Sequence, residues 1–314
     1  LQYIQILLMQ SLFTERRMQM APEYRNNNWI QNYFFVDFPV TAPRYVSRDK
    51  RLDAAHRLSG ILKVQLVTVD PLFIGSGFQE LEDGQFIKQT LTENNKPIIP
   101  GSSLKGAVRQ ICRAVSQSCV PQESCRINLP QGTMRQCKPE RKSDLDQACI
   151  VCDMFGKMGW CSKVFFSDLI AECGTTARFQ AAQQFAPHPD AEKYLDEDGY
   201  HAYKFYKTKV NSVTKPQNDK LRAVPPETVF TGEITYRNLD KKELGLLLFG
   251  LGQSRSISLK LGGYRNEGFG TVNITLASDQ IGDTLAMTNE FIDSVDDTLV
   301  FGIEQLEDGM PYKE

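Results

Sequence analysis

Six stretches of this chain carry the hydrophobic periods of strands and helices, and their order is the feature that most restricts its fold. Alternation such as that of Leu62, Val64 and Leu66 predicts strands, and apolar residues at helical spacing predict helices. In chain order, the predicted elements are strand 61–70, helix 104–115, strand 164–170, strand 230–237, helix 240–251 and strand 272–276. This order predicts an α+β, ferredoxin-like βαββαβ core, with one open antiparallel sheet and helices on one of its faces.

The predicted elements divide the chain into a core and flanking segments. We expect the core at 61–276, with a cysteine-bearing insertion at 118–155 and a polar, proline-rich and mobile insertion at 175–228. Residues 1–60 are predicted to be an irregular N-terminal extension, and residues 277–314 an acidic C-terminal segment.

Composition excludes several classes of protein. Of 314 residues, 41% are hydrophobic and 24% are charged, which excludes wholesale disorder, collagen and coiled coil. No run of about 18 apolar residues exists, so we expect no membrane span. Residues 1–13 lack the basic start and the cleavage site of a signal peptide. Because the first residue is Leu1 rather than Met, we expect the native start to be missing.

Charge is unevenly distributed along the chain. The net charge is −2, and residues 277–314 hold ten acidic residues and one basic residue, so residues 1–276 carry +7. A basic body with an acidic tail suits a polyanionic partner. A merely solvated acidic C-terminus is the alternative.

The motif IPGSSLKGAVR at 99–109 predicts a helix start that binds an anion. Free backbone N–H groups at such a start attract phosphate, and bases spaced by four residues line one helix face, where they can follow a phosphate backbone. Exposed bases in contact with solvent are the alternative. The candidate RNA-binding residues here are Ser102, Ser103, Lys105, Arg109 and Arg113.

A second motif, LGGYRNEGFG at 261–270, is a glycine-rich loop that leads into a strand. Its glycines allow a ligand to approach the backbone, its aromatic side chains can stack on bases, and its arginine can pair with a phosphate. A long glycine hairpin without a ligand is the alternative. The candidate RNA-binding residues are Gly262, Gly263, Tyr264, Arg265 and Phe269.

Taken together, the motifs resemble a known family. IPGSSLKGAVR, C-x-x-C-x-x-FG, VFFSDL, VPPETVFTGEI, ELGLLLFGLG and LGGYRNEGFG follow in the order seen in the RAMP superfamily of CRISPR type III effector complexes. The similarity covers about Gly60 to Leu276, and it is closest to the backbone subunit that repeats along the guide RNA. The resemblance implies an RRM-like fold, crRNA and target RNA as ligands, other RAMP-family subunits as partners, and a prokaryotic cytoplasm.

The resemblance also implies a catalytic acid. In active relatives an acidic residue before IPGSSLKG cleaves target RNA with a divalent metal, and Asp83 in DGQFIK matches its position. Asp83 would help to hold Mg²⁺ or Mn²⁺ or orient the 2′-OH, with Glu80 and Glu82 as helpers. Because inactive paralogues occur, the alternative is a scaffold subunit that binds crRNA without cutting, in which the acidic loop is only solvated.

Eight cysteines lie within 112–173, and Cys149-x-x-Cys152 has the spacing of a metal knuckle. Four thiolates around Zn²⁺ would fold an insertion too small for a core of its own, and zinc fingers occur in the III-D and III-E branch of the family that the chain resembles. A C-x-x-C redox pair is the alternative. The expected ligands are Cys125, Cys137, Cys149 and Cys152, with Cys119 as the substitute for Cys125; the remaining Cys112, Cys161 and Cys173 are predicted to be core or free thiols.

The stretch GYHAYKFYK at 199–207 interleaves aromatic residues with Lys204 and Lys207. Such a pattern can stack against a guide–target duplex, and the stretch lies where the resembled family places its thumb. A solvated insertion with a small aromatic cluster is the alternative. The three histidines, His56, His188 and His201, lie in no recognisable setting for nucleophilic catalysis.

Overall fold

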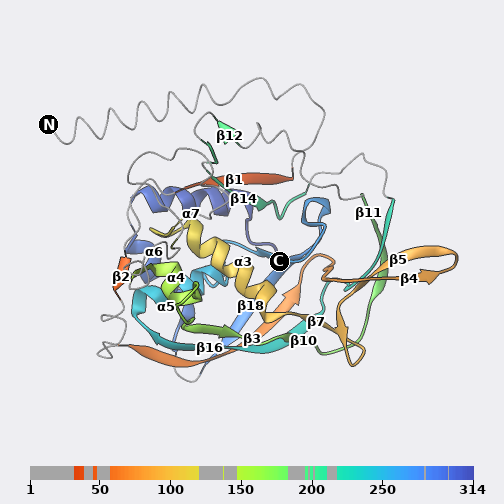
Figure 1. Cartoon of the computed structure of the whole chain (residues 1–314), viewed down its shortest axis with the longest axis horizontal. Helices are drawn as coiled ribbons and strands as arrows, with labels where there is room; N and C mark the ends of the chain where they lie inside the picture. Colours follow the sequence, from red (N-terminus) through yellow and green to blue (C-terminus); the bar gives the residue numbers. More distant parts are fainter. Residues whose placement is uncertain are drawn as a thin grey trace. The chain divides into compact units, whose positions relative to one another are not determined.

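A curled antiparallel sheet is the centre of this computed structural model of mixed α and β structure (Figure 1). Its strands run in the order β17 (Leu259–Lys260), β18 (Thr271–Ala277), β3 (Leu58–Thr68), β16 (Val229–Leu239), β10 (Leu169–Ala171), β7 (Lys96–Ile99) and β6 (Thr92–Glu93), and β9 (Val164–Phe166) also pairs with β16. The structure describes residues 32–38, 45–47, 57–119, 137, 147–182, 195–196, 199–200, 202–210, 218–278, 281–295 and 297–314. All of them belong to the unit Asn32–Glu314.

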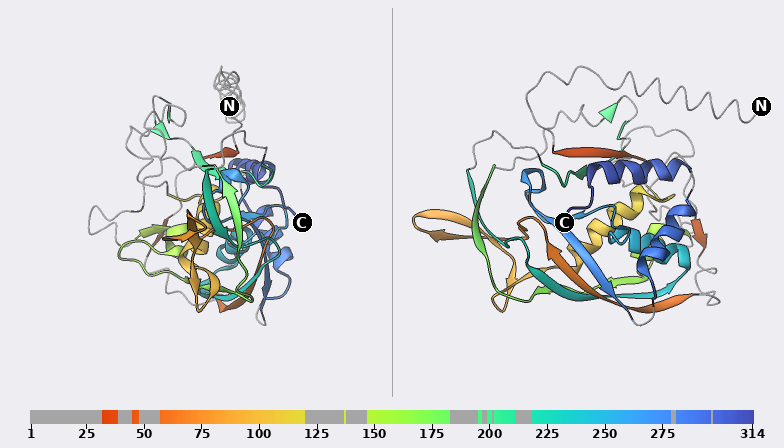
Figure 2. Two further views of the ribbon diagram at one scale, coloured as in Figure 1. Left: turned by 90° about the vertical axis from the view of Figure 1, so that its right-hand side faces the viewer. Right: turned by 180° about the vertical axis from the view of Figure 1, so that it is seen from behind.

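The longer helices lie on one side of this sheet (Figures 1 and 2). They are α3 (Gly101–Ala114), α5 (Lys241–Gly250), α6 (Thr284–Asp293) and α7 (Asp297–Gly309). On β3 the side chains of Leu62, Val64 and Leu66 point into the core below the helices, whereas Lys63 and Gln65 are exposed. The alternation that predicted this strand therefore reflects a sheet that is covered on one face.

The predicted elements of the core are confirmed, with one change. The predicted strand 164–170 is divided into β9 and β10, since Ser167 and Asp168 belong to neither strand. The Asp168 carboxylate accepts a hydrogen bond from the Gly101 N–H at 2.7 Å. Asp240 caps α5 in a capping box with Glu243, as its position predicted.

A second sheet contains β11 (Ala177–Ala181), β15 (Asp219–Ala223), β5 (Gln85–Thr90) and β4 (Gly75–Glu82), in that order. The glycines at 75, 77 and 84 predict a loop between the first strand and the first helix, and the structure has the β4–β5 hairpin there. Its two-residue turn is Asp83-Gly84, with φ values of 51° and 74°. Asp-Gly is favoured in such turns because both positions require positive φ.

Short strands also occur where no regular element was expected. β1 (Tyr33–Asp37) pairs with β14 (Ala202–Tyr206), β2 (Tyr45–Ser47) with β8 (Gln147–Cys149), and β12 (Leu195–Asp196) with β13 (Gly199–Tyr200). The sequence YFFVD of β1 is apolar on both faces, so no alternation marked it. A last short helix, α4 (Ile150–Phe155), follows β8 directly.

The acidic C-terminal segment contains two helices that pack on the core. Ile303, Leu306 and Met310 of this segment are buried in the main cluster. An added Cβ at Gly302 would lie 2.8 Å from the Ala114 carbonyl oxygen, so glycine is required where α7 approaches α3. Six of the ten acids, Glu290, Asp293, Asp297, Glu304, Glu307 and Asp308, lie on these helices, which also contribute apolar side chains to the core. Among the described residues, no helix has the length and apolar character to cross a membrane.

Candidate metal centre and RNA-binding residues

Four cysteines meet in one buried cluster beside helix α3. The Sγ atoms of Cys119, Cys137, Cys149 and Cys152 all lie within 4.8 Å of one another. A tetrahedral Zn²⁺ site with Zn–S bonds of about 2.3 Å requires S–S separations of about 3.8 Å. The cluster therefore has the donor set and the size to hold a metal ion. Within the described part of the chain, it is the one group of three or more Cys, His, Asp or Glu residues placed to do so.

Local structure brings these thiols together. Cys149 ends β8 and caps α4, where its Sγ accepts a hydrogen bond from the Cys152 N–H at 3.4 Å. The Cys137 Sγ accepts from the Cys149 N–H at 3.3 Å, and the sulfurs of Cys119 and Cys152 are 3.5 Å apart. Hydrogen bonds from Cys119 and the other thiols lower the pKa of Cys152. The same hydrogen bonds raise the pKa of Cys137 and Cys149, so the network favours thiolate, the form that binds metal, at Cys152.

The fourth thiol of the cluster is Cys119, the predicted substitute for Cys125. Cys119, which follows α3, lies in the cluster with the predicted Cys137, Cys149 and Cys152. Cys125 lies outside the described residues. Of the remaining cysteines, Cys112 is buried in the core, and Cys161 and Cys173 are exposed.

Cations predicted to line the surface of α3 instead contact other parts of their own chain. Lys105 Nζ donates to Ser162 Oγ at 2.9 Å and to the Val164 carbonyl at 3.2 Å. Burial lowers the pKa of Lys105. Arg109 Nη2 donates to the Gly156 carbonyl at 2.9 Å and contacts Cys152 Sγ at 3.6 Å. The stripe therefore joins α3 to the segment that follows the metal knuckle.

The helix start predicted to bind a phosphate already has an anion from this chain. Asp168 accepts the Gly101 N–H, and a Cβ at Gly101 would lie 2.3 Å from the Phe166 carbonyl oxygen. The glycine is thus required by close packing of this chain on itself. Ser102 and Ser103 are exposed, and Arg113 is partly buried.

The glycine-rich loop also packs on its own chain. Tyr264 and Phe269 are buried in a small second cluster, and Tyr264 Oη donates to Asp219 at 2.7 Å and accepts from Lys88 at 2.9 Å. A Cβ at Gly262 would lie 2.4 Å from the Phe73 carbonyl oxygen. In this loop, packing accounts for both aromatic rings, and Gly263 also donates its N–H to Phe73.

Two predicted RNA-binding segments meet at a cluster of cations and aromatic rings. The Arg265 guanidinium lies 4.4 Å from the centre of the Tyr206 ring. Lys204 Nζ lies 5.5 Å from the same ring and 4.1 Å from the Tyr33 ring. Tyr33 and Tyr206 are paired across β1 and β14, so their side chains share a face. We call these four residues the cation–aromatic cluster. Lys207, just after β14, donates its backbone N–H to Asn32 and is partly buried.

The candidate catalytic acid lies in the β4–β5 turn and is paired. The Asp83 side chain is 77% exposed and contacts Arg178 at 2.7 Å. The neighbouring Glu82 is held by Arg222 and Arg178, whose hydrogen bonds lower its pKa to about 2. Both carboxylates therefore have arginine partners from β11 and β15.

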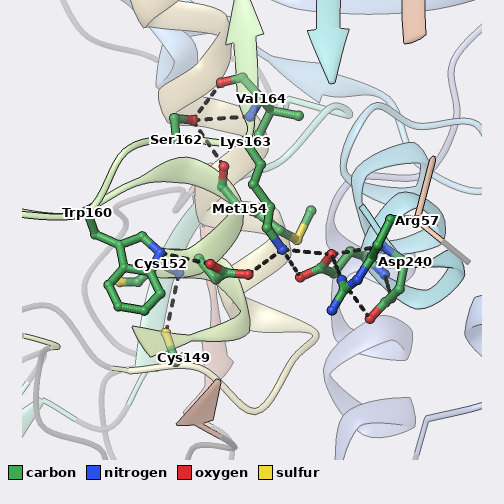
Figure 3. A network of polar contacts seen from close by, with 11 residues as sticks. Arg57, Cys149, Cys152, Met154, Trp160, Ser162, Lys163, Val164 and Asp240 are labelled. Carbon is green, nitrogen blue, oxygen red and sulfur yellow. Dashed lines mark hydrogen bonds and ion pairs between the residues drawn. The ribbon is translucent and has the colours of Figure 1, made fainter. Parts of the chain in front are cut away.

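A buried ion network lies beside the metal centre, and no sequence pattern predicted it (Figure 3). Lys163, between Asp153 and Glu243, forms ion pairs with both and lies 2.9 Å from Glu243 Oε1. The network continues to Arg57, 3.0 Å from Glu243, and to Trp160 Nε1, which donates to Asp153 at 2.8 Å. Burial raises the pKa of Glu243 to about 7 against the opposing effect of Lys163. The capping-box spacing Asp240-x-x-Glu243 was visible, but the buried lysine had no sequence signal.

A family model and solved structures are similar to this chain. The family model described as "RAMPs: RAMP superfamily" matches residues 65–273. Among solved structures, a chain titled "Type IV-B CRISPR Complex" is similar with a TM-score of 0.38 and 15% sequence identity, over 71% of this chain and 92% of that chain. The search of curated proteins finds no match.

Proposed function

Because this chain belongs to the RAMP superfamily, we propose that it binds guide RNA as a subunit of a CRISPR ribonucleoprotein, of type III as its motifs imply. The proposed core is ferredoxin-like (RRM-like). In support, the neighbouring strands β18, β3, β16 and β10 are antiparallel, and α3 and α5 each follow one strand and precede another. The proposed partners are crRNA, target RNA and other RAMP-family subunits.

The cation–aromatic cluster is the observation that carries the RNA-binding proposal. It joins Lys204 of β14 to Arg265 of the glycine-rich loop, through Tyr206, although 61 positions separate the two cations in the sequence. Aromatic rings bind bases by stacking, and cations beside them bind phosphates. A net charge of +7 over residues 1–276 adds attraction for a polyanion.

Guide-RNA binding measured across a series of salt concentrations tests this proposal. Arg265→Gln should reduce the slope of log K against log salt by about 0.7–1, because one phosphate contact is lost. Tyr206→Ala should weaken binding by about 1–3 kcal/mol, or about 5–150-fold, through lost stacking. Arg237→Gln is the matched control. Arg237 also lies near an aromatic ring, 5.7 Å from that of Phe165, but it belongs to β16 and not to the cluster. Wild-type binding by both cluster variants would refute the assignment.

We further propose that the subunit is a scaffold that does not cut target RNA, the alternative left open by the sequence. Three features of Asp83 support this: it lies in an Asp-Gly turn, it pairs with Arg178, and its neighbour Glu82 is held by two arginines. A Mg²⁺ ion would have to compete with these arginines for the carboxylates. Mapping the cuts in target RNA against subunit positions tests the proposal, and a cut at this subunit that Asp83→Asn removes would overturn it.

The metal proposed for the cysteine cluster is structural Zn²⁺. Four sulfur donors without a nitrogen or oxygen donor favour zinc among common divalent ions, and a closed four-ligand set is typical of structural sites. The ion would cross-link the end of α3 to the start of α4. Elemental analysis of the purified protein should find one zinc per chain, and a metal-free protein in which Cys149 and Cys152 form a disulfide would instead favour the redox alternative.

A further inference from the structure

The guanidinium of Arg109 contacts its own chain, whereas a side chain that binds RNA phosphate would face the RNA. It extends from α3 toward α4, and its Nη2 reaches both the Gly156 carbonyl at 2.9 Å and Cys152 Sγ at 3.6 Å. Its Nε is buried and has no hydrogen-bond partner among the described residues. The guanidinium is thus placed between α3 and the metal knuckle.

A cluster of four thiolates needs positive charge close by. With Zn²⁺ bound, four thiolates leave a net charge of −2 in a buried site, which is unfavourable without compensation. The nearby Lys163 is already committed to Asp153 and Glu243. Arg109 contacts a thiol of the cluster directly, and its N–H donates toward sulfur.

Arg109 also fixes the geometry of the knuckle. Gly156 ends α4, where its φ of 87° requires glycine-like freedom, and Cys152 lies one turn earlier in the same helix. One guanidinium therefore contacts both ends of this turn. Both contacts are made by Nη2, whose two N–H bonds have fixed directions in the plane of the guanidinium, whereas the ammonium of lysine is a point charge on a flexible stem.

The geometry points to Arg109 as a positioning residue of the metal centre, acting through Cys152 and Gly156, and not as a ligand for guide-RNA phosphates. This inference rests on the proposed metal. Residues that hydrogen-bond to metal ligands orient them, and their replacement weakens metal binding by about 10–100-fold. The same substitution should leave RNA binding unchanged, whereas a phosphate ligand would show the reverse.

Zinc release to the chelator 4-(2-pyridylazo)resorcinol tests the inference on the full chain. Arg109→Gln should release zinc about 10–100-fold faster than wild type, and Arg109→Lys should lie between them, because it keeps the charge but lacks the planar guanidinium with its fixed N–H directions. Arg237→Gln, which removes the same charge from the exposed face of β16, should release zinc at the wild-type rate. The Co²⁺-substituted protein provides a second readout, in which Arg109→Gln should shift the sulfur-to-metal absorption band.

The salt slope of guide-RNA binding separates the two roles of Arg109. We expect the slope for Arg109→Gln to match wild type, and a decrease of about 0.7–1 would overturn the inference. Zinc release by Arg109→Gln within twofold of the wild-type rate would also overturn it. If Arg109→Gln does not fold, the same result for Arg109→Lys would overturn it. Wild-type protein that contains no metal would overturn the zinc proposal as well, so the two failures can be told apart.

Discussion

Replacing Lys163 with methionine should destabilise the fold strongly, and more at alkaline than at acidic pH. Lys163 is 4% exposed and forms ion pairs with Asp153 and Glu243, both also buried. Removing one partner of a buried ion pair costs about 3–5 kcal/mol, because the remaining charge stays buried. Asp153 keeps the Trp160 N–H and Glu243 keeps Arg57. We therefore expect a loss of about 3–4 kcal/mol at pH 8.

The pH dependence follows from Glu243. Its pKa in the folded protein is about 7, above the ordinary value of 4.5. A carboxyl group with a raised pKa binds its proton more tightly in the folded state, so its contribution to stability is full below pH 4.5 and is lost as pH rises toward 7. Removing Lys163 raises this pKa further. At pH 5.5, where Glu243 is protonated, the loss in Lys163→Met should therefore be smaller by at least about 1 kcal/mol.

Urea unfolding followed by tryptophan fluorescence measures both effects. With a slope m of about 3 kcal/mol per M, the pH 8 midpoint should fall by about 1 M. Lys163→Met with Glu243→Gln should recover part of the loss, since the second change removes one of the two buried negative charges that Lys163 neutralises. Lys63→Met, on the exposed face of β3, should shift stability by less than about 0.5 kcal/mol. A loss below about 1 kcal/mol at pH 8, or an equal loss at both pH values, would refute the reasoning.

Three further predictions concern the cysteines, the glycines and the hairpin. Cys119→Ser should abolish stoichiometric zinc and Cys125→Ser should retain it, and elemental analysis showing the opposite would return the fourth ligand to Cys125. Gly270→Ala should destabilise by several kcal/mol, roughly 3 or more, because its Cβ would lie 2.0 Å from the Leu261 carbonyl oxygen. Gly84→Ala, at φ +74° with open space around the Cβ, should lose only about 1 kcal/mol. Thermal melts measure both losses, and equal losses would contradict the packing argument. Asp83→Asn should leave the thermal midpoint and guide-RNA binding unchanged, and a loss of either would give this exposed turn a structural role.

Periodicity predicted the core because one face of the central sheet is buried and the other is exposed. The alternation of β3 is a direct consequence of that arrangement, whereas Asp240 was predictable because the free N–H groups at the start of α5 need an acceptor. The same reasoning missed β1, where consecutive apolar residues hide the period, and the β4–β5 hairpin, where glycines looked like loop residues. The Asp83-Gly84 turn was readable in principle, since this dipeptide favours two-residue hairpins.

Site residues were predicted by chemical type, which does not fix the direction of a side chain. Lys105 and Arg109 have the spacing of a phosphate-binding stripe, but both contact the segment after the knuckle. Their partners lie 43 or more positions away in sequence. Tyr264 and Phe269 likewise are buried through contacts of the tertiary fold. The cysteine spacing was more informative, because a knuckle is a local structure that needs only a short strand and a helix.

One turn of α4 joins the metal centre to the buried ion network, and this should make their contributions to stability interdependent. Cys152 is in the sulfur cluster, and the next residue, Asp153, pairs with Lys163. A helix as short as α4 is not stable alone, so both attachments hold the same turn in place. Loss of zinc in Cys119→Ser should loosen this turn and reduce the cost of Lys163→Met. The double variant should therefore lose less stability than the two single losses together, by about 0.5–3 kcal/mol. Strict additivity in urea unfolding would show that the two attachments act on separate parts of the fold.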